Sequence, residues 1–390
     1  MEPGAMMAAA LEAADRFDLP ARPCVVQPLT IGHIHESFIV ETDAPTPADC
    51  ATAGAVQSTG CGRRFLLQRV NQNVFPDPDA LLSNMRRVTE HVTAKLRAVG
   101  AADAERRVLT LVPTVGGAAS YRDSNGAYWR MMRFIEGTTA YAEALSPAHA
   151  ERAGRAFGEF QRLLADLPPP RLVETIPHFH DTPRRYGALR AAIAADARRR
   201  VKESRAEIEF ALAREAPAGR LLELHRLGEI PERIVHNDAK ISNVLFDART
   251  DEPLCVVDLD TVMPGLALFD FGDMVRSMTC AAPEDERDLS RVSVSIEMFA
   301  ALARGYLVAA GRMLTSCERE HLVLSGWLIS LEQGVRFLTD FLAGDAYYRA
   351  ERPRQNLDRC RTQFALVRSI ERQRGELEGR VAVCESRVTS

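Results

Sequence analysis

RIVHNDAKISNVLFDARTDEPLCVVDLDTVMPGLALFDFGD, residues 233–273, is the stretch around which the rest of this 390-residue sequence is interpreted. Its short apolar runs alternate with polar loops rich in Asp and Asn, and these runs lie at 234–235, 244–246 and 254–257. Runs of this kind, broken by Asp-rich turns, predict short strands joined by loops. The loops are expected to bring three oxygen-bearing side chains close together, those of Asp238, Asn243 and Asp258.

These three side chains match the requirements of phosphoryl transfer. One carboxylate accepts the proton of the attacking hydroxyl, while an amide oxygen and a second carboxylate hold Mg²⁺ against the nucleotide phosphates. Protein kinases carry H-R-D-x-x-x-x-N for this purpose, and here His236-Asn237-Asp238 is followed by Asn243. Asp258 lies 20 residues after Asp238, which leaves room for one hairpin. Asp238 is therefore the candidate base, and Asn243 and Asp258 are the candidate ligands of Mg²⁺-ATP.

Two neighbouring residues join this candidate site. Asp260 follows Asp258 closely and is a further candidate metal contact. Lys240 lies two residues after Asp238 and could neutralise charge on the transferred phosphate. The triplet Asp270-Phe271-Gly272 spells the kinase motif D-F-G, but it follows what is interpreted as a turn leading into a helix. Asp270 is therefore expected to be structural, as a helix N-cap that braces the catalytic loop.

The pattern HNDxKxxNVLFD…VxDLDTVMPGLxxxDFGD resembles the aminoglycoside-phosphotransferase-like small-molecule kinases, and among them most closely the N-acetylhexosamine 1-kinases. This resemblance implies an α+β, bilobal, protein-kinase-like fold. Residues 1–136 would form an N-terminal lobe with an antiparallel sheet, interrupted by a small, polar, turn-rich insertion at 43–63. Residues 137–390 would form a larger, mainly helical C-terminal lobe for catalysis and acceptor binding, with ATP lying between the lobes.

The N-terminal part offers three further candidates. Two predicted strands flank a turn that contains Gly32, which is the layout of a loop covering nucleotide phosphates. His33 follows it, and the resemblance to the family's G-H-I motif, here Gly32-His33-Ile34, implies that His33 contacts the acceptor. The next strand lacks the usual kinase lysine, and Arg69 is its best cationic substitute, because arginine binds phosphate oxygens bidentately. The family resembled shows the same L-Q-R-x-N, here Leu67 to Asn71.

Candidate acceptor contacts come mainly from the resemblance. The segment G-x-R-F-L-T-D at 334–340 and the following D-x-Y imply that Arg336 and Tyr347 contact a sugar. His180, within F-H-x-T, is assigned to the substrate on the same basis. One departure bears on sugar preference, because Ser277 stands where the family tends to place an aromatic residue that stacks on the sugar.

Composition narrows the class of protein. The formal net charge is −4, so no overall basic field favours nucleic acid or an anionic membrane. The eight cysteines include no C-x-x-C pair, which fits free thiols in a reducing compartment. The sequence shows no signal-peptide pattern and no apolar run long enough to span a bilayer. A cytoplasmic location is therefore expected.

The sequence thus predicts an ATP- and Mg²⁺-dependent kinase. Its expected reaction is phosphorylation of the anomeric C1 hydroxyl of N-acetylglucosamine or N-acetylgalactosamine, giving the sugar 1-phosphate. The same core would serve other acceptors, namely homoserine, choline, a hydroxylated amino acid or an aminoglycoside. A pseudokinase that only binds its ligands is a further alternative, but it would be expected to have lost part of the set Asp238, Asn243 and Asp258.

Overall fold

The computed structural model describes residues 3–29, 34–43 and 63–389. Contacts within the chain divide it into two compact units, Met1–Thr138 and Thr139–Ser390. Each unit is described separately below. Gly32, His33 and most of the predicted insertion, residues 44–62, lie outside the described residues.

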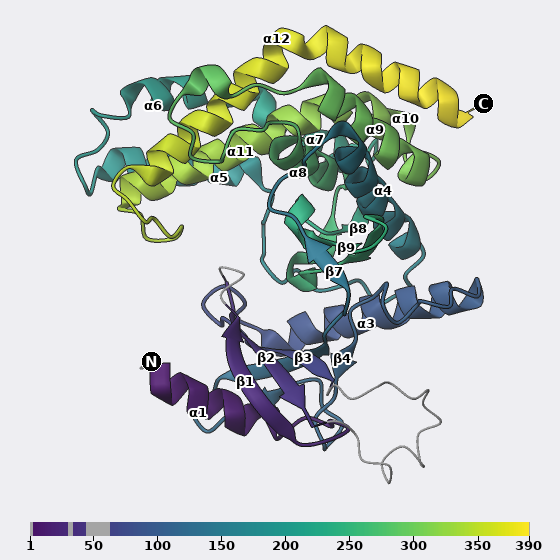
Figure 1. Ribbon diagram of the computed structural model, residues 1–390. Helices are drawn as coiled ribbons and strands as arrows, with labels where there is room; N and C mark the ends of the chain where they lie inside the picture. Colours follow the sequence, from purple (N-terminus) through teal and green to yellow (C-terminus); the bar gives the residue numbers. More distant parts are fainter. Residues whose placement is uncertain (1–2, 30–33, 44–62, 390) are drawn as a thin grey trace. The chain divides into compact units, whose positions relative to one another are not determined.

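The N-terminal unit is built on an antiparallel sheet (Figure 1). In the described residues its strand order is β1-β2-β3-β6-β4, and β5 pairs with β6. Val40 of β2 lies opposite Phe65 of β3, and Leu67 of β3 lies opposite Met131 of β6. The strands are β1 (Pro23–Leu29), β2 (Glu36–Thr42), β3 (Arg64–Arg69), β4 (Leu111–Val112), β5 (Tyr121–Arg122) and β6 (Tyr128–Arg133).

Two helices complete this unit, α1 (Pro3–Ala14) and α3 (Pro78–Ala98). Alternate residues of the strands point to one face of the sheet, where Phe38, Leu67 and Trp129 form a core with Ala10 of α1. Helix α3 buries an apolar stripe and begins at Asp77, whose side chain accepts a hydrogen bond from the backbone N–H of Ala80. The alternation predicted for these strands is therefore what builds the N-terminal core.

Short strands of the C-terminal unit carry the polar loops of residues 236–243 and 257–262. One small sheet has the order β10-β9-β7, and a second pairs β11 with β8, where Val235 lies opposite Met263. The strands are β7 (Thr138–Ala140), β8 (Arg233–Val235), β9 (Val244–Asp247), β10 (Pro253–Val256) and β11 (Met263–Gly265). Single 3-10 turns, η2 (Ile241–Asn243) and η3 (Leu259–Thr261), lie in the two loops.

Helices make up the rest of the C-terminal unit. They are α4 (Pro147–Leu164), α5 (Thr182–Ala195), α6 (Arg205–Leu212), α7 (Arg220–Arg226), α8 (Ala267–Met278), α9 (Ile296–Ala310), α10 (Ser316–Glu320), α11 (Leu322–Ala343) and α12 (Gln355–Thr389), with 3-10 turns η1 (Ala216–Gly219) and η4 (Leu289–Arg291). Helix α4 has a side-chain cap: Ser146 is the N-cap and accepts a hydrogen bond from the N–H of His149, and Pro147 follows.

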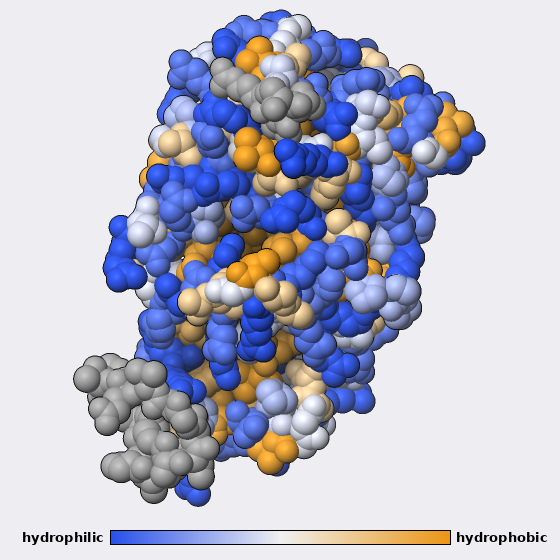
Figure 2. Space-filling model, turned by 90° about the vertical axis from the view of Figure 1, so that its right-hand side faces the viewer, coloured by the Kyte–Doolittle hydropathy of each residue, from blue (hydrophilic) through white to orange (hydrophobic). Residues whose placement is uncertain are grey.

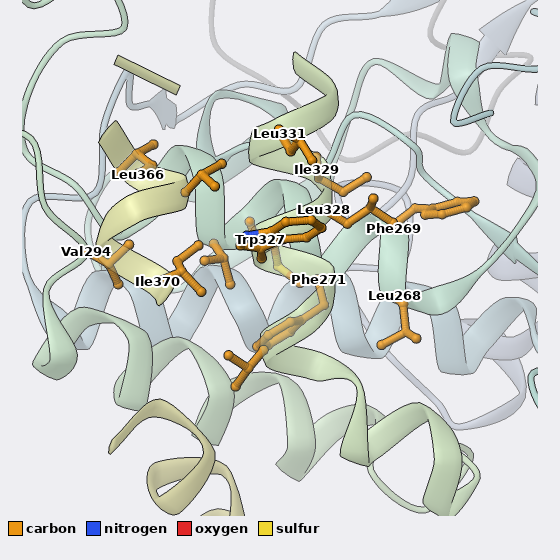
Figure 3. Packing of buried hydrophobic residues seen from close by; sticks show 14 of the residues in the cluster. Leu268, Phe269, Phe271, Val294, Trp327, Leu328, Ile329, Leu331, Leu366 and Ile370 are labelled. Atoms are coloured by element: carbon orange, nitrogen blue, oxygen red, sulfur yellow. The ribbon is translucent and has the colours of Figure 1, made fainter. Parts of the chain in front are cut away.

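Glycines let the helices of the C-terminal core approach closely. A Cβ on Gly305 of α9 would lie 1.9 Å from the carbonyl oxygen of Glu151 on α4. A Cβ on Gly272 of α8 would lie 2.4 Å from the carbonyl oxygen of Ser325 on α11. Figure 3 shows Phe271 of α8, Trp327 of α11 and Ile370 of α12, which belong to one buried hydrophobic cluster. The glycine of the D-F-G triplet is therefore a helix-packing residue.

The predicted fold class is confirmed: the chain is α+β, with an antiparallel sheet in the N-terminal unit and a mainly helical C-terminal unit. Three local details differ from the sequence-based interpretation. Residues 108–115, whose sequence predicts one strand, form only the short β4. Residues 186–227, whose sequence predicts one or two long charged helices, hold the end of α5 followed by α6, η1 and α7. Helix α12 was not predicted, because its charged residues obscure the apolar stripe that it buries.

None of the helices in the described part of the chain combines the length and apolarity that a bilayer crossing requires. On the face seen in Figure 2, hydrophilic residues cover most of the surface and hydrophobic ones appear in small groups between them.

Candidate active site

The loop between β8 and β9 carries the first group of candidate residues. His236, at the end of β8, is fully buried and faces Phe157. Its Nε2 donates to the carbonyl oxygen of Val257 at 2.9 Å, while its Nδ1 accepts from the N–H of Asp238 at 3.3 Å. This bonding requires the neutral tautomer with the proton on Nε2. His236 thereby fixes the backbone of Asp238 against the loop that contains Asp258.

Asn243 is held directly on Asp238. Its Nδ2 donates to the backbone carbonyl of Asp238 at 2.8 Å and to the carboxylate Oδ2 at 3.0 Å. The amide hydrogens are therefore used within the loop, which leaves the carbonyl oxygen Oδ1 as the atom available to a metal. A 3-10 turn, η2, places Asn243 within reach of Asp238 across five residues.

Asp258 is linked to the same loop through its neighbours. The N–H of Val257 donates to the carbonyl oxygen of Asn243 at 2.9 Å. Across the loops, Nδ2 of Asn237 donates to the carbonyl of Thr261 at 2.9 Å, and Oγ1 of Thr261 donates to the carbonyl of His236 at 2.7 Å. The structure therefore brings Asp238, Asn243 and Asp258 into one cluster of loops.

Backbone strain occurs at two positions of this cluster. Asn237 has φ 64° and Asp258 has φ 60°, the left-handed region that side-chain-bearing residues seldom occupy. Asn and Asp tolerate this region best among such residues. Because such strain persists only where surrounding bonds impose it, the two loops are held in a specific conformation.

Asp270 braces the catalytic loop, as predicted. Its carboxylate accepts from the backbone N–H groups of His236 at 2.9 Å and Asn237 at 2.7 Å. It also accepts from Nε2 of Gln161 at 2.6 Å. The expectation that Asp270 is the helix N-cap is wrong, because α8 begins after Leu266 and Asp270 lies in its first turn. A carboxylate there still benefits from the positive end of the helix dipole.

Asp238 and Lys240 form an ion pair, with 2.9 Å between Nζ and Oδ2. Burial favours protonation of Asp238, but attraction to Lys240 and the hydrogen bond between them outweigh it and lower the pKa of Asp238 to about 2. Burial likewise disfavours the charged form of Lys240, yet the nearby Asp238 raises its pKa. Asp238 is therefore a carboxylate at neutral pH, ready to accept a hydrogen bond from a hydroxyl.

Asp258 has the opposite shift. Burial raises its pKa, and the nearby carboxylates of Asp260 and Asp238 raise it further. Asp260 is itself buried, and its backbone carbonyl accepts from Oγ1 of Thr175 at 2.7 Å. Crowded carboxylates of this kind are relieved by a bound cation.

The donor set fits a magnesium ion held jointly with a nucleotide. In the described residues, no group of three or more His, Cys, Asp and Glu side chains could hold a metal by itself. Magnesium, however, is commonly bound by one or two carboxylates together with substrate phosphates. Carboxylate oxygens of Asp258 and Asp260 and the amide oxygen of Asn243 are ligands of the type it requires.

His180 bridges the catalytic loop and α11. Its Nε2 lies 3.0 Å from the carbonyl oxygen of Asn237, and its Nδ1 lies 2.9 Å from Oε1 of Glu332. The other oxygen of Glu332 accepts from Oγ1 of Thr182 at 2.6 Å. Burial would raise the pKa of Glu332, but His180 outweighs it and the pKa is lowered. Glu332 was not among the residues singled out from the sequence; its pairing with His180 spans 152 residues.

Arg336 and Tyr347, assigned from the sequence to the acceptor, lie on α11 and on the loop that follows it. Nη1 of Arg336 donates to Oε1 of Gln333 at 3.0 Å, and its guanidinium lies 5.7 Å from the ring centre of Tyr348. Tyr347 is 62% exposed and its ring contacts that of Tyr348. Asp340 holds this loop, because its carboxylate accepts from the N–H groups of three consecutive residues, Ala346 to Tyr348.

Helix α8 contributes another charged pair that sequence reasoning missed. Nε of Arg276 donates to Oδ1 of Asp273 at 2.7 Å, and its Nη1 donates to Glu284 at 3.1 Å. Oδ2 of Asp273 is buried without a hydrogen-bond partner. The hydroxyl of Ser277 donates to the carbonyl of Asp273 at 2.7 Å, so it is used within the helix.

The candidates of the N-terminal unit are only partly described. Arg69, at the end of β3, forms an ion pair with Glu36 on β2 at 2.8 Å. Its Nε is buried and has no hydrogen-bond partner among the described residues. Gly32 and His33 lie outside the described residues.

Comparisons with known proteins identify a family and similar folds. The model of the phosphotransferase enzyme family matches residues 55–318. The fold is similar to that of a microcompartment-associated aminopropanol kinase, at 15% identity and a TM-score of 0.59 over 96% of this chain and 99% of that one. The fold is also similar to that of an amicoumacin kinase solved with AMP-PNP and Ca²⁺, at 13% sequence identity and a TM-score of 0.55 over 93% of each chain. For a choline kinase from Cryptosporidium parvum Iowa II, the sequence identity is 12% and the TM-score is 0.52 over 94% of this chain and 93% of that one.

Proposed function

The chain belongs to the phosphotransferase enzyme family, and we propose that it transfers the γ-phosphate of ATP to a hydroxyl group of a small molecule. The single observation that carries this proposal is the loop cluster of Asp238, Asn243 and Asp258, held together by the hydrogen bonds of His236 and Asn237. The amicoumacin kinase of similar fold was solved with an ATP analogue and a divalent cation. That complex supports ATP and a divalent cation as the cofactors.

Asp238 is the residue proposed to receive the acceptor hydroxyl. Its low pKa makes it a weak base, which suits a transition state in which the hydroxyl proton leaves late. The carboxylate first orients the hydroxyl oxygen by accepting its hydrogen bond. It then takes the proton as the new oxygen–phosphorus bond forms.

Lys240 is proposed to serve the phosphate. In the structure its ammonium group neutralises Asp238. A transferred phosphoryl group next to Asp238 would offer the same cation a second set of oxygens. Charge neutralisation at that point lowers the barrier, because the transition state spreads negative charge over the phosphoryl oxygens.

Asn243 and Asp258 are proposed to hold Mg²⁺, with Asp260 as a further contact. The ion supplies neutralisation of the nucleotide phosphates and holds them in place. The raised pKa of Asp258 supports this assignment, since a cation would stabilise its charged form. In the N-terminal unit, Gly32 and Arg69 are the proposed contacts to the nucleotide.

For the acceptor, we propose the anomeric C1 hydroxyl of an N-acetylhexosamine. Arg336, Tyr347 and His33 are the residues proposed to contact it, on the resemblance of the C-terminal segments and the G-H-I turn. The bonds made by both ring nitrogens of His180 favour a role for that residue in positioning the catalytic loop. Homoserine, choline, a hydroxylated amino acid and an aminoglycoside are the acceptors to compare.

An acceptor panel tests the proposal. Each compound is incubated with the enzyme, ATP and Mg²⁺, ADP release is followed in a coupled assay, and ³¹P and ¹H NMR locate the new phosphate. The proposal expects acceptor-dependent ADP release and one phosphate ester, at C1 for the hexosamines. Absence of acceptor-dependent ADP release across the whole panel would count against a small-molecule kinase.

A further inference from the structure

Two arginines meet at Phe179, the residue before His180. Nη2 of Arg185, in the first turns of α5, donates to the carbonyl oxygen of Phe179 at 2.7 Å. The guanidinium of Arg336, on α11, lies 5.3 Å from the centre of the Phe179 ring. One residue therefore brings together guanidinium groups from two helices. We call Arg185 and Arg336 the arginine pair.

In the described part of the chain, neither member of the arginine pair lies in direct contact with a carboxylate. In the described residues, no ion pair within 4.0 Å is formed by either, whereas Arg276 on α8 pairs with both Asp273 and Glu284. Nε of Arg185 is buried and lacks any hydrogen-bond partner. Leaving a buried donor of a charged group unpaired costs more than leaving a neutral one. The arginine pair is therefore incomplete without a further acceptor of hydrogen bonds.

The neighbouring charged residues act on the two guanidinium groups of the arginine pair. Burial lowers the pKa of Arg185, and the nearness of Arg336 lowers it further. The carboxylate of Glu332 attracts both guanidinium groups, and its two oxygens are bonded to His180 and Thr182. Tyr348 contributes a ring and a phenol that accepts from Gln333, with no charge of its own at neutral pH. The arginine pair thus places two positive charges against the single negative charge of Glu332.

The arginine pair lies next to the catalytic loop along the chain of contacts. Phe179 holds the arginines, and the adjacent His180 bonds the carbonyl oxygen of Asn237, the residue before Asp238. Burial would lower the pKa of Arg336, and repulsion from Arg276 acts in the same direction, but attraction to Tyr348 and Glu332 outweighs both and raises that pKa. A group bound by the pair would belong to a molecule whose hydroxyl reaches Asp238.

We propose that Arg185 and Arg336 form a subsite for a carboxylate or phosphate group carried by the acceptor. This inference rests on the proposed function and narrows it to anionic hydroxy compounds. Among N-acetylhexosamines it selects those with an acidic substituent. It disfavours choline and other amines, whose positive charge the pair would repel. Guanidinium forks suit planar, bidentate recognition of either anion.

Matched acceptors test the subsite directly. Each pair differs by one acidic group: glucose and glucuronic acid, glycerol and glycerate, N-acetylglucosamine and its 6-phosphate. Hydrogen bonds to a charged group contribute about 1.5–3 kcal/mol, so kcat/KM should be about 10- to 100-fold higher for the acid. The first two pairs test a carboxylate and the third a phosphate. Equal kcat/KM for the members of all three pairs would overturn the proposal.

Substitutions assign the effect to the pair. Arg185→Gln should raise KM for the preferred acid by about tenfold or more, while KM for its neutral partner changes little. Arg336→Gln should raise KM for both acceptors, because Arg336 is also a proposed sugar contact, and the increase should be about tenfold or more larger for the acid. Arg336→Lys keeps the positive charge but loses the bidentate guanidinium, so its KM for the acid should lie between those of the wild type and Arg336→Gln. Arg190→Gln is the matched control on the same helix, because Arg190 is exposed and pairs with Glu215. A uniform loss for acid and neutral acceptors alike would contradict an anion subsite.

A binding measurement separates this inference from the proposed kinase activity. Sulfate should raise the Tm of the wild-type protein above that in chloride of equal ionic strength, and Arg336→Gln and Arg185→Gln should abolish the difference. If sulfate stabilises only the wild type and Arg190→Gln, the subsite stands even when no acceptor is phosphorylated. If acceptors are phosphorylated but sulfate acts equally on all variants, the kinase proposal survives and the subsite is excluded.

Discussion

At the scale of single residues, the site is a set of carboxylates with opposite electrostatic environments. Lys240 keeps Asp238 charged, whereas Asp260 and Asp238 disfavour charge on Asp258. When the pKa values of two carboxyl groups are shifted in opposite directions, the two groups are suited to different chemical tasks. Asp238 is suited to a hydroxyl proton, and Asp258 to a cation that relieves its crowding.

Asp258→Asn should therefore remove the dependence of ATP binding on magnesium. The wild type is expected to bind ATP at least about tenfold more tightly with Mg²⁺ than without it, since charged hydrogen-bonding and metal contacts of this type contribute more than 1.4 kcal/mol. Isothermal titration calorimetry with and without Mg²⁺ measures the difference. Asp288→Asn, which changes the exposed carboxylate that caps η4, is the control. Retention of the full magnesium effect in Asp258→Asn would remove Asp258 from the metal site.

The lowered pKa of Glu332 predicts that its contribution to the free energy of unfolding depends on pH. Its pKa is lowered in the folded chain, so the stabilisation is present above the ordinary Glu pKa of about 4.3 and is lost as pH falls through the lower folded value. Breaking such a buried pair typically costs about 3–5 kcal/mol. Glu332→Gln should therefore lower the free energy of unfolding at pH 7 by about 3 kcal/mol, and the gap should narrow in acid.

Urea denaturation of both proteins at several pH values measures this gap. Glu297→Gln, which removes an exposed carboxylate of α9, is the control and should change little. A gap that stays constant as the pH is lowered would show that the charge of Glu332 is not what stabilises the fold.

At the scale of elements, close helix packing holds the catalytic loop in place. Asp270 on α8 binds the backbone of the loop, and α8 in turn lies against α11 through Gly272. Helix α11 then carries Glu332, which reaches the same loop through His180. The loop is thus fixed from two sides by helices that touch each other.

Gly272→Ala tests this arrangement. The new Cβ would lie 2.4 Å from the carbonyl oxygen of Ser325, which is backbone and cannot move independently. Overpacking of this kind costs about 1–3 kcal/mol, measured as the free energy of unfolding in urea. Gly187→Ala on α5 is the matched control, because a Cβ there meets nothing within 4 Å. Equal stability of the two variants would contradict the packing role of Gly272.

At the scale of the whole molecule, the sequence predicted what is local and missed what is distant. Asp238, Asn243 and Asp258 are joined by short strands within one stretch, so their spacing alone indicated that they meet. Asp270 was correctly expected to brace the catalytic loop, because the residues before it are typical of a turn leading into a helix. The fold class followed from the same strand pattern together with the resemblance.

Contacts between distant helices could not be read from the sequence. The bond between His180 and Glu332 spans 152 residues, and the meeting of Arg185 with Arg336 at Phe179 depends on how α5 packs against α11. The hydrophobic periodicity of a helix does not show how that helix is rotated relative to another one. Helix α12 escaped prediction for a related reason, since charged residues outnumber the apolar ones along much of its length.

Transfer of the terminal phosphate from γ-³²P-labelled ATP to the best acceptor of the panel, compared between wild type and Asp238→Asn, tests the central claim most directly. Loss of a positioned general base lowers rates by about 10²- to 10⁴-fold. The account predicts labelled phosphate ester with the wild type, a loss of that size in kcat with Asp238→Asn, and unchanged Mg²⁺-ATP binding by the variant. Transfer by Asp238→Asn at the wild-type rate would contradict it.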